Sequence, residues 1–179
     1  GASPPLVIRL AAQARAATHT RQAGGPALIM DEFGGSRHAD SAAASADVAD
    51  GLGISWSYWS VLQLHDPTGN PREALLNQQT GRPSRRKARA LAVAYPVATA
   101  GTPGPVAFNR STGAFAYSYR VDAHVHAPTE IELPRWAYPL GYRTQVRGAR
   151  VVSGRDATVL LLRAQPPATV VTLSVRRNA

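Results

Sequence analysis

The sequence predicts two kinds of fold in one chain, an α/β segment over residues 1–97 and an antiparallel β-sandwich over residues 98–179. A short apolar run at residues 26–30 leads straight into two carboxylates, an aromatic and two glycines, which is typical of a buried parallel strand. Helical and strand patterns alternate up to residue 94. Beyond residue 95, short segments with period-two alternation follow one another between Gly- and Pro-containing turns, which is typical of a sandwich.

The α/β segment is predicted to run helix, strand, helix, strand, helix. Ser3 offers a capping hydroxyl, and Pro4 and Pro5 suit the first turn of a helix that reaches Ala17. The later elements are expected to be a strand at residues 26–35, an alanine-rich helix at 41–50, a strand at 52–60, a loop at 65–71 and a helix at 84–94. Two strands cannot form a self-sufficient parallel sheet, so we expect this segment to be the end of a larger one.

The sandwich is predicted from seven alternating segments. Turn residues separate them, including Ser111-Thr112-Gly113, Gly154 and Pro166-Pro167. The expected strands cover residues 106–109, 114–121, 129–133, 142–147, 149–152, 158–163 and 169–175. The change of pattern places the predicted boundary between the two parts at residue 97/98.

The composition of the 179-residue chain limits which partners and which kinds of metal site are possible. Its net charge of +9 comes from 20 basic and 11 acidic residues, a balance that suits nucleic acid, an anionic membrane surface or simply a solvated arginine-rich surface. Only residues 82–89 form a basic cluster, so we expect no nucleic-acid partner. The absence of cysteine excludes disulfides and thiolate metal sites. No apolar run approaches the roughly 20 residues of a membrane span.

Glu32 is the strongest candidate for a catalytic group. Charged residues have no place inside a buried strand, so Asp31 and Glu32 should lie at its C-terminal end, where barrel enzymes collect their catalytic residues. Glycoside hydrolysis by a retaining mechanism uses a pair of carboxylates, one of which attacks the sugar. Alternation along the strand turns Asp31 away from Glu32 and favours a supporting role for it. A solvated acid at a strand end is the other interpretation of Glu32.

The second candidate group is aromatic. Sugars present apolar CH faces that stack on aromatic rings, so Trp59, at the end of the second predicted strand, could be a sugar platform. Alternation places Trp56 and Tyr58 on one side of that strand and Trp59 on the other. Ordinary burial is the alternative for all three, and it is the better interpretation of Trp56.

Two further pairs carry weaker signals. His124 and His126 have a spacing that could chelate a metal from a strand face, but no third ligand is evident, and surface or turn histidines are the better interpretation. Trp136 and Tyr138 lie in a proline-containing loop. They could contact lipid or sugar, or pack beneath the loop.

Taken together, these stretches resemble a known family. The Asp31-Glu32-Phe33-Gly34 strand end and the Trp59 strand end are similar to the last two βα units, with strands 7 and 8, of the (β/α)8 TIM barrels of family-five retaining glycoside hydrolases. The endoglycosylceramidase (endoglycoceramidase) subgroup is the most similar. The segments that carry this likeness lie at residues 58–60, 66–69, 73–75, 87–91, 95–96, 100–103, 115–119, 129–135 and 138–142.

The resemblance implies roles that composition could not show. Glu32 corresponds to the catalytic nucleophile and Trp59 to the tryptophan that lines the sugar subsite, with Asp31 and Tyr58 as supporting residues. Residues 98–179 correspond to the β-sandwich that follows the barrel. Substrates would be glycosphingolipids or related β-glucosides, with no cofactor and no metal. The resemblance is also compatible with secretion or a cell-surface location and with peripheral contact with a membrane surface.

The sequence departs from the family in one large respect. The acid/base glutamate of the family lies in an Asn-Glu pair, and this chain has no such dipeptide. The preceding barrel units are missing too, so we expect the chain to be the C-terminal part of a longer enzyme. Alone it should be inactive, and it should pair with the N-terminal barrel portion, dimerise or aggregate. The alternatives are a non-catalytic carbohydrate- or lipid-surface-binding module and, less well supported, a basic nucleic-acid-binding domain that uses residues 82–89.

Overall fold

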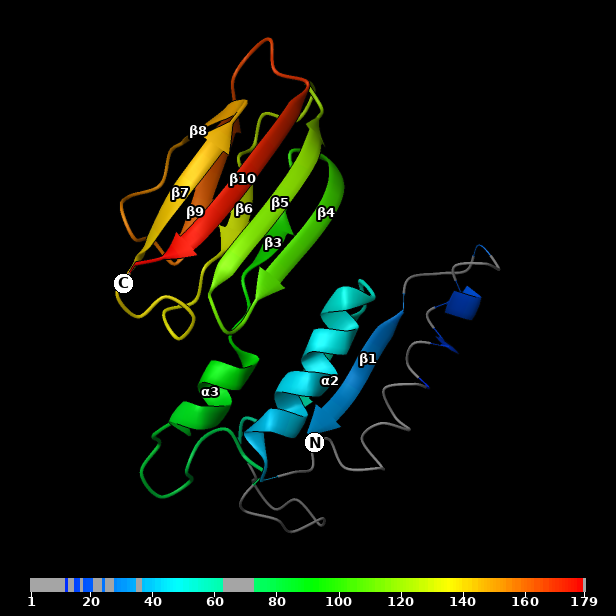
Figure 1. The fold of residues 1–179 in the computed structure, drawn as a ribbon, viewed down its shortest axis with the longest axis vertical. Coiled ribbons are helices and arrows are strands. Elements are labelled where there is room, and N and C mark those ends of the chain that lie inside the picture. The colour runs from blue at the N-terminus through cyan, green and yellow to red at the C-terminus, as the bar shows by residue number, and fades with distance from the viewer. Residues whose placement is uncertain are drawn as a thin grey trace. The chain divides into compact units, whose positions relative to one another are not determined.

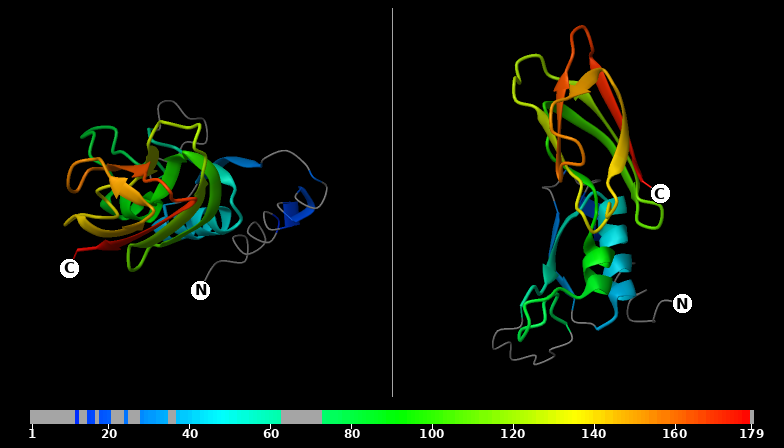
Figure 2. Two further views of the ribbon diagram at one scale, coloured as in Figure 1. Left: turned by 90° about the horizontal axis from the view of Figure 1, so that it is seen from above. Right: turned by 90° about the vertical axis from the view of Figure 1, so that its left-hand side faces the viewer.

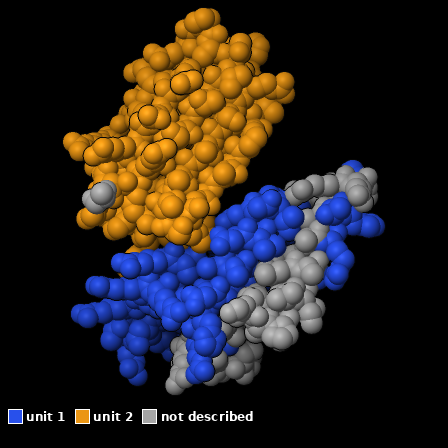
Figure 3. Space-filling model, viewed as in Figure 1, with its two compact units in different colours: residues 1–91 blue, residues 92–179 orange. Residues whose placement is uncertain are grey.

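A computed structural model describes residues 12, 15–16, 18–20, 24, 28–34, 37–62 and 73–178. The chain divides into two compact units, unit 1 over Gly1–Leu91 and unit 2 over Ala92–Ala179 (Figure 3). The predicted boundary at residue 97/98 would cut through a strand, because the chain already joins the sheets of unit 2 at Tyr95.

In the part of unit 1 that the structure describes continuously, a two-stranded parallel sheet packs with helices α2 and α3 (Figure 1). Strand β1 covers Ile29–Gly34 and strand β2 covers Ser55–Trp59, and helix α2, Ala39–Gly51, connects them. This β-α-β order agrees with the strand, helix and strand predicted over residues 26–60. The predicted helix over residues 3–17 lies largely outside the described residues, although residues 12 and 15–16 are helical. The predicted loop at 65–71 lies wholly outside them.

Helix α2 packs through a stripe of small side chains. Ala39, Ala42, Ala46 and Ala49 are all buried, and their spacing places them on one face of a helix. Ala49 and Ile54 form a small core, with Leu28, Met30, Leu52 and Trp56 packed around it. The thin apolar face that the sequence shows is therefore a close-packing face.

Helix α3 is shorter than the sequence pattern predicts. It covers Arg85–Leu91 rather than residues 84–94, and residues 92–94 lead into the first strand of unit 2. Arg86 of α3 and Asp40 of α2 form an ion pair with an N–O distance of 2.7 Å.

Unit 2 is a sandwich of two four-stranded antiparallel sheets (Figure 2). One sheet has the order β4-β5-β10-β7 and the other β3-β6-β9-β8. The bounds are β3 Tyr95–Ala98, β4 Gly101–Asn109, β5 Ala114–Val121, β6 Thr129–Glu132, β7 Tyr142–Arg147, β8 Ala149–Val151, β9 Val159–Ala164 and β10 Val170–Arg177. The predicted sandwich is confirmed, with each of the seven expected strands present.

The core of unit 2 lies between the two sheets. Its large, fully buried members come from alternate positions of facing strands, as period-two patterning requires. They include Phe115, Tyr119, Ile131, Leu160, Leu162, Val171 and Val175.

The sequence pattern missed strand β3 and the first half of β4. Both are edge strands, and both contain proline: Pro96 in β3, and Pro103 and Pro105 in β4. Proline has no backbone N–H to donate to the neighbouring strand, so within sheets it is found mainly on edge strands. In the sequence alone, a stretch with several prolines indicates a turn, and these strands were therefore missed. Pairing with β6 and β5 brings them into the sheets.

Candidate functional site

The C-terminal ends of β1 and β2 lie side by side. The strands run parallel, with Phe33 opposite Tyr58 and Gly34 opposite Trp59. This register brings Glu32 and Trp59, the two leading candidates from the sequence, to the same edge of the sheet. Both side chains are exposed, and that of Trp59 is 43% accessible.

A bulge in β1 interrupts the regular alternation of side chains at Asp31 and Glu32. Met30 pairs with Trp56 and Phe33 pairs with Tyr58, so three steps along β1 match two along β2. An extra residue of this kind re-aims side chains and often lies next to functional sites. Asp31 and Glu32 are both exposed as a result. Strict alternation, from which the opposite orientation of Asp31 was predicted, does not hold here.

Phe33 anchors the strand end on the opposite, packed side. Its ring makes edge-on contacts with Trp56, at a centroid distance of 5.3 Å, and with Tyr58, at 5.6 Å. The indole Nε1 of Trp56 donates a hydrogen bond of 2.8 Å to Asp50. Trp56 therefore belongs to the packing against α2, as expected, and Tyr58 shares its side of the strand.

Gly34 allows the two strand ends to approach each other. It has a φ of +149°, and a Cβ at this position would collide with the carbonyl oxygen of Trp59. The peptide bond that follows Trp59 is cis. The tight contact at Gly34 sets the distance between the backbone that carries Glu32 and the backbone that carries Trp59.

Tyr58 and Lys87 together hold the segment that follows β2. The Tyr58 hydroxyl donates to the carbonyl oxygen of Glu73 at 2.8 Å, and Lys87 Nζ donates to the same oxygen at 2.6 Å. Lys87 is only 3% exposed and its Nζ lies 5.8 Å from the centroid of the Tyr58 ring. This arrangement gives Tyr58 a structural role beneath the site.

Burial shifts the pKa values of Lys87 and Tyr58. Desolvation lowers the pKa of Lys87, and the nearby Glu73 charge partly opposes this effect. Burial also raises the pKa of Tyr58, and Glu73 adds to the rise. Sequence reasoning missed Lys87 because it stands among exposed arginines. A signal was present, since Lys87 precedes Ala88 on the predicted inner face of α3 and is the one lysine of an arginine-rich chain.

This edge therefore offers two exposed carboxylates, those of Asp31 and Glu32, and the exposed indole of Trp59 on paired backbone. A carboxylate can attack an electrophilic carbon, and an indole can support an apolar ring face. Among the residues that the structure describes, no three His, Asp or Glu side chains are placed to hold a metal ion.

The remaining sequence candidates lie elsewhere. His124 and His126 are exposed in the loop after β5. Trp136 is 39% exposed, whereas Tyr138 is 3% exposed and packs in the core of unit 2, so the pair does not form one surface. Within the basic stretch 82–89, Lys87 is buried and Arg86 is paired with Asp40. No helix in the described part of the chain is long and apolar enough to cross a membrane.

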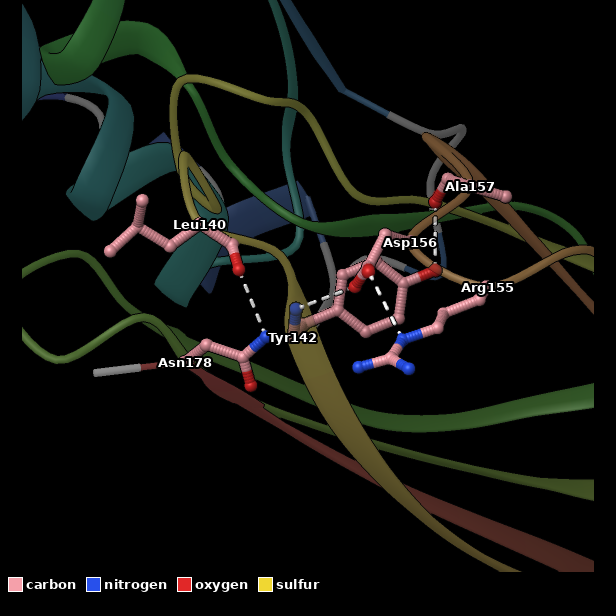
Figure 4. Close-up of polar contacts among 6 residues, drawn as sticks. All are labelled: Leu140, Tyr142, Arg155, Asp156, Ala157 and Asn178. Atoms are coloured by element: carbon pink, nitrogen blue, oxygen red, sulfur yellow. Dashed lines mark hydrogen bonds and ion pairs between the residues drawn. The ribbon is translucent and has the colours of Figure 1, made fainter.

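A polar cluster closes the end of unit 2 near Gly141 (Figure 4). Asp156 accepts a hydrogen bond from the Tyr142 amide and pairs with Arg155, while the Tyr142 hydroxyl donates to Ala157 at 2.7 Å. Gly141 has a φ of +81°, and a Cβ there would collide with Asp156. The contacts join β7 to the loop before β9, so this cluster is structural.

Comparisons with known proteins identify a related domain in unit 2. Residues 94–175 match the model of the glycoside hydrolase family 5 C-terminal domain. The chain is 36% identical over 112 residues to endoglycoceramidase I of Rhodococcus hoagii (strain 103S), a match that covers 63% of this chain and 20% of that protein. The matched residues therefore span about a fifth of the length of this relative.

Solved structures extend the likeness to unit 1. The lactosyl-enzyme intermediate of endo-glycoceramidase II from Rhodococcus sp. is 28% identical with a TM-score of 0.68, over 96% of this chain and 38% of that chain. Sterylglucosidase 1 of Cryptococcus neoformans is similar in fold, with 22% identity and a TM-score of 0.58 over 79% of this chain and 24% of that chain. Residues 94–175 are thus a glycoside hydrolase family 5 C-terminal domain, and the chain as a whole matches the C-terminal portion of an endoglycoceramidase of that family.

Proposed function

We propose that the chain is the C-terminal segment of a retaining β-glycosidase that hydrolyses glycosphingolipids or related β-glucosides. The observation that carries the proposal is the pairing of Gly34 with Trp59, which brings Glu32 and Trp59 to one edge of the sheet. The names of the relatives, two endoglycoceramidases, support the class of substrate. One of them was solved as a lactosyl-enzyme intermediate, the kind of covalent species through which a retaining mechanism passes.

Glu32 acts as the nucleophile in this proposal. A carboxylate oxygen of Glu32 forms a bond to the anomeric carbon while the bond from that carbon to the aglycone oxygen breaks. The departing oxygen takes a proton from the acid/base group, and water then releases the sugar with the opposite proton transfer. Trp59 supports the sugar ring and Asp31 assists from a neighbouring position, while Tyr58 supports the site from beneath through its hydrogen bond to Glu73. This chemistry requires no metal and no organic cofactor.

Unit 1 would supply strands 7 and 8 of a (β/α)8 barrel. Its two-stranded parallel sheet needs neighbours to complete it, since parallel sheets occur almost only as larger, doubly covered structures. The partner is the N-terminal barrel portion of the same enzyme, which brings the acid/base glutamate. Alone, the chain has one half of the carboxylate pair and should be inactive. A secreted or cell-surface location belongs to the same proposal.

A covalent label tests the role of Glu32 directly. The chain would be produced together with the N-terminal barrel portion and incubated with an activated 2-deoxy-2-fluoro-β-glycoside, which forms a slowly hydrolysed glycosyl-enzyme. Mass spectrometry of peptides should place the sugar on Glu32. A label on any other carboxylate would contradict the assignment.

Substitution provides the matched control. Glu32→Gln should lower turnover of fluorogenic β-glucosides and glycosphingolipids by several orders of magnitude, because an amide is a poor nucleophile. Glu130→Gln removes a carboxylate from β6 of unit 2 and should leave turnover unchanged. Full activity of Glu32→Gln would rule out the nucleophile role. Tight glycolipid binding by the assembled protein without any turnover would favour the alternative of a non-catalytic binding module.

A further inference from the structure

The outer face of the sheet β4-β5-β10-β7 carries four exposed arginines, Arg120, Arg143, Arg147 and Arg176, which we call the arginine face. The alternation of each strand places them there. On β5 and β10 the buried residues are Phe115, Tyr117, Tyr119, Val171, Leu173 and Val175. The residues between them therefore point away from the core, and on β7 the exposed positions are Arg143, Gln145 and Arg147.

The four arginines of this face have no carboxylate partner among the described residues. Arg176 of β10 lies directly opposite Arg143 of β7, and Arg147 lies opposite Thr172. Like charges in directly opposed positions destabilise a sheet. Among the residues that the structure describes, no carboxylate forms an ion pair with any arginine of this face.

The carboxylates of unit 2 lie elsewhere. Glu130 and Glu132 belong to β6, in the other sheet. Asp122 accepts a hydrogen bond from the His124 amide in the loop after β5, and Asp156 pairs with Arg155 near Gly141. Unit 2 has ten arginines against these four carboxylates. All four carboxylates lie off the arginine face, together with the other six arginines, so the four charges of this face have no carboxylate among them.

We propose that the arginine face docks onto an anionic lipid surface. Between the arginines the face presents mostly short side chains. They are Ala114, Ala116, Ser118, Thr172 and Ser174, together with Gln145 and the exposed Val170. The guanidinium groups are therefore its longest side chains. A lipid surface is flat and requires only complementary charge. Single-stranded nucleic acid would require aromatic platforms, which the exposed positions of β5, β7 and β10 lack, and duplex DNA would require an element that enters a groove.

The inference does not depend on the catalytic role of Glu32. It adds a surface on which the proposed hydrolase would meet membrane-embedded substrate, and its test uses vesicles without glycolipid and reads binding instead of hydrolysis. A negative result in the vesicle experiment would therefore not contradict the catalytic role of Glu32, and a negative result for Glu32 would not contradict vesicle binding.

Flotation of vesicles through a density gradient is the measurement, because aggregated protein does not float. The full chain should float with phosphatidylcholine vesicles that contain phosphatidylglycerol and not with phosphatidylcholine alone. High salt should abolish the flotation, since exposed charges are screened within about one Debye length. Each arginine near an anionic surface strengthens binding about fivefold, so the double variant Arg143→Gln/Arg176→Gln should bind about 30-fold more weakly.

The opposite sheet provides a matched control. Arg150 and Arg163 form a second cross-strand arginine pair, between β8 and β9, so Arg150→Gln/Arg163→Gln removes the same charge from the other face. This control should retain flotation. Equal losses in both double variants would overturn the proposal, as would equal binding to neutral vesicles. Salt-sensitive binding of duplex DNA through Arg143 and Arg176, without flotation, would assign the face to nucleic acid instead.

Discussion

Gly34 of β1 lies directly opposite Trp59 of β2, and the backbone of Trp59 occupies the space that a side chain at Gly34 would need. Because φ at Gly34 is +149°, an L-residue there is also strained. We expect Gly34→Ala to destabilise unit 1 by about 3 kcal/mol or more, combining overpacking with backbone strain. Chemical denaturation followed by tryptophan fluorescence, in a Trp136→Phe background, reports on unit 1 through Trp56 and Trp59.

Gly51 is the control for this substitution. It lies at the end of α2, and a Cβ there would meet nothing within 4 Å. Gly51→Ala should leave the midpoint unchanged or raise it slightly. If Gly34→Ala were no more destabilised than Gly51→Ala, the close approach of the strand ends would have no energetic consequence.

Tyr138 and Tyr142 differ in one hydrogen bond although their rings are in contact, at a centroid distance of 5.6 Å. The Tyr142 hydroxyl donates to Ala157, whereas the buried Tyr138 hydroxyl has no partner among the described residues. Tyr142→Phe should therefore lower the free energy of unfolding of unit 2 by about 1 kcal/mol, and Tyr138→Phe should leave it unchanged or raise it slightly. Urea titration at neutral pH compares the two, and the reverse order would contradict the hydrogen-bond assignment.

Arg86 and Lys87 are neighbours in α3 with different surroundings. The Arg86–Asp40 ion pair is exposed, with side-chain accessibilities of 72% and 82%, so Arg86→Gln should change stability by about 0.5 kcal/mol or less. Lys87 is buried and donates to the Glu73 carbonyl, so Lys87→Gln should cost about 2 kcal/mol. Urea denaturation of unit 1 distinguishes them; a similar small effect of both would show that the Lys87 contact contributes little.

Unit 2 should lose stability in alkali. Burial raises the pKa of Tyr117, Tyr138 and Tyr142 above the ordinary value of 10.0. Above pH 10 the unfolded chain releases tyrosine protons that the folded unit retains, so the free energy of unfolding falls as the pH rises. Each tyrosine contributes a slope of at most about 1.4 kcal/mol per pH unit.

Urea midpoints measured from pH 8 upward should be level at first and then decline beyond pH 10. Tyr138→Phe should make the decline shallower, because it removes one of the titrating groups. An unchanged slope in that variant would show that Tyr138 titrates alike in the folded and unfolded states.

Trp59 should contribute to sugar binding in the assembled enzyme. Trp59→Ala removes the exposed ring at the strand end, and we expect kcat/KM for β-glucosides to fall about tenfold, which corresponds to roughly 1.4 kcal/mol. Trp136→Ala removes an exposed tryptophan of unit 2 and serves as the control, with no change expected. Steady-state kinetics on fluorogenic substrates measures both. Equal effects of the two changes would exclude a specific role for Trp59.

Much of the architecture was predictable from local patterns. Strands such as β5 and β7 agree with the predicted ranges because their inward side chains alternate strictly, and alternation is a local property of sequence. The order strand, helix, strand in unit 1 follows from the apolar run that ends at Met30, the alanine-rich helix and the aromatic strand. The same local signals brought Glu32 and Trp59 forward as candidates.

Other features depend on contacts between distant residues. The bulge that exposes both Asp31 and Glu32 arises from the register of β1 on β2, and a strand read alone cannot show its register. The proline-containing edges β3 and β4 became strands only because β6 and β5 pair with them. Tyr138 is buried whereas Trp136 is exposed, and Lys87 is buried whereas the arginines beside it are exposed. The sequence alone does not distinguish these neighbours.

Periodicity and residue type along short stretches were enough to predict the strand, helix and strand of unit 1, the sandwich, and the two residues on which the proposed chemistry depends. Three features could not be predicted in this way: the spacing that Gly34 sets beneath Glu32 and Trp59, the burial of Lys87 beneath Tyr58, and the sharing of one sheet face by four arginines. Those features are set by which strands pair and in which register, and pairing energies are summed over residues far apart in the chain.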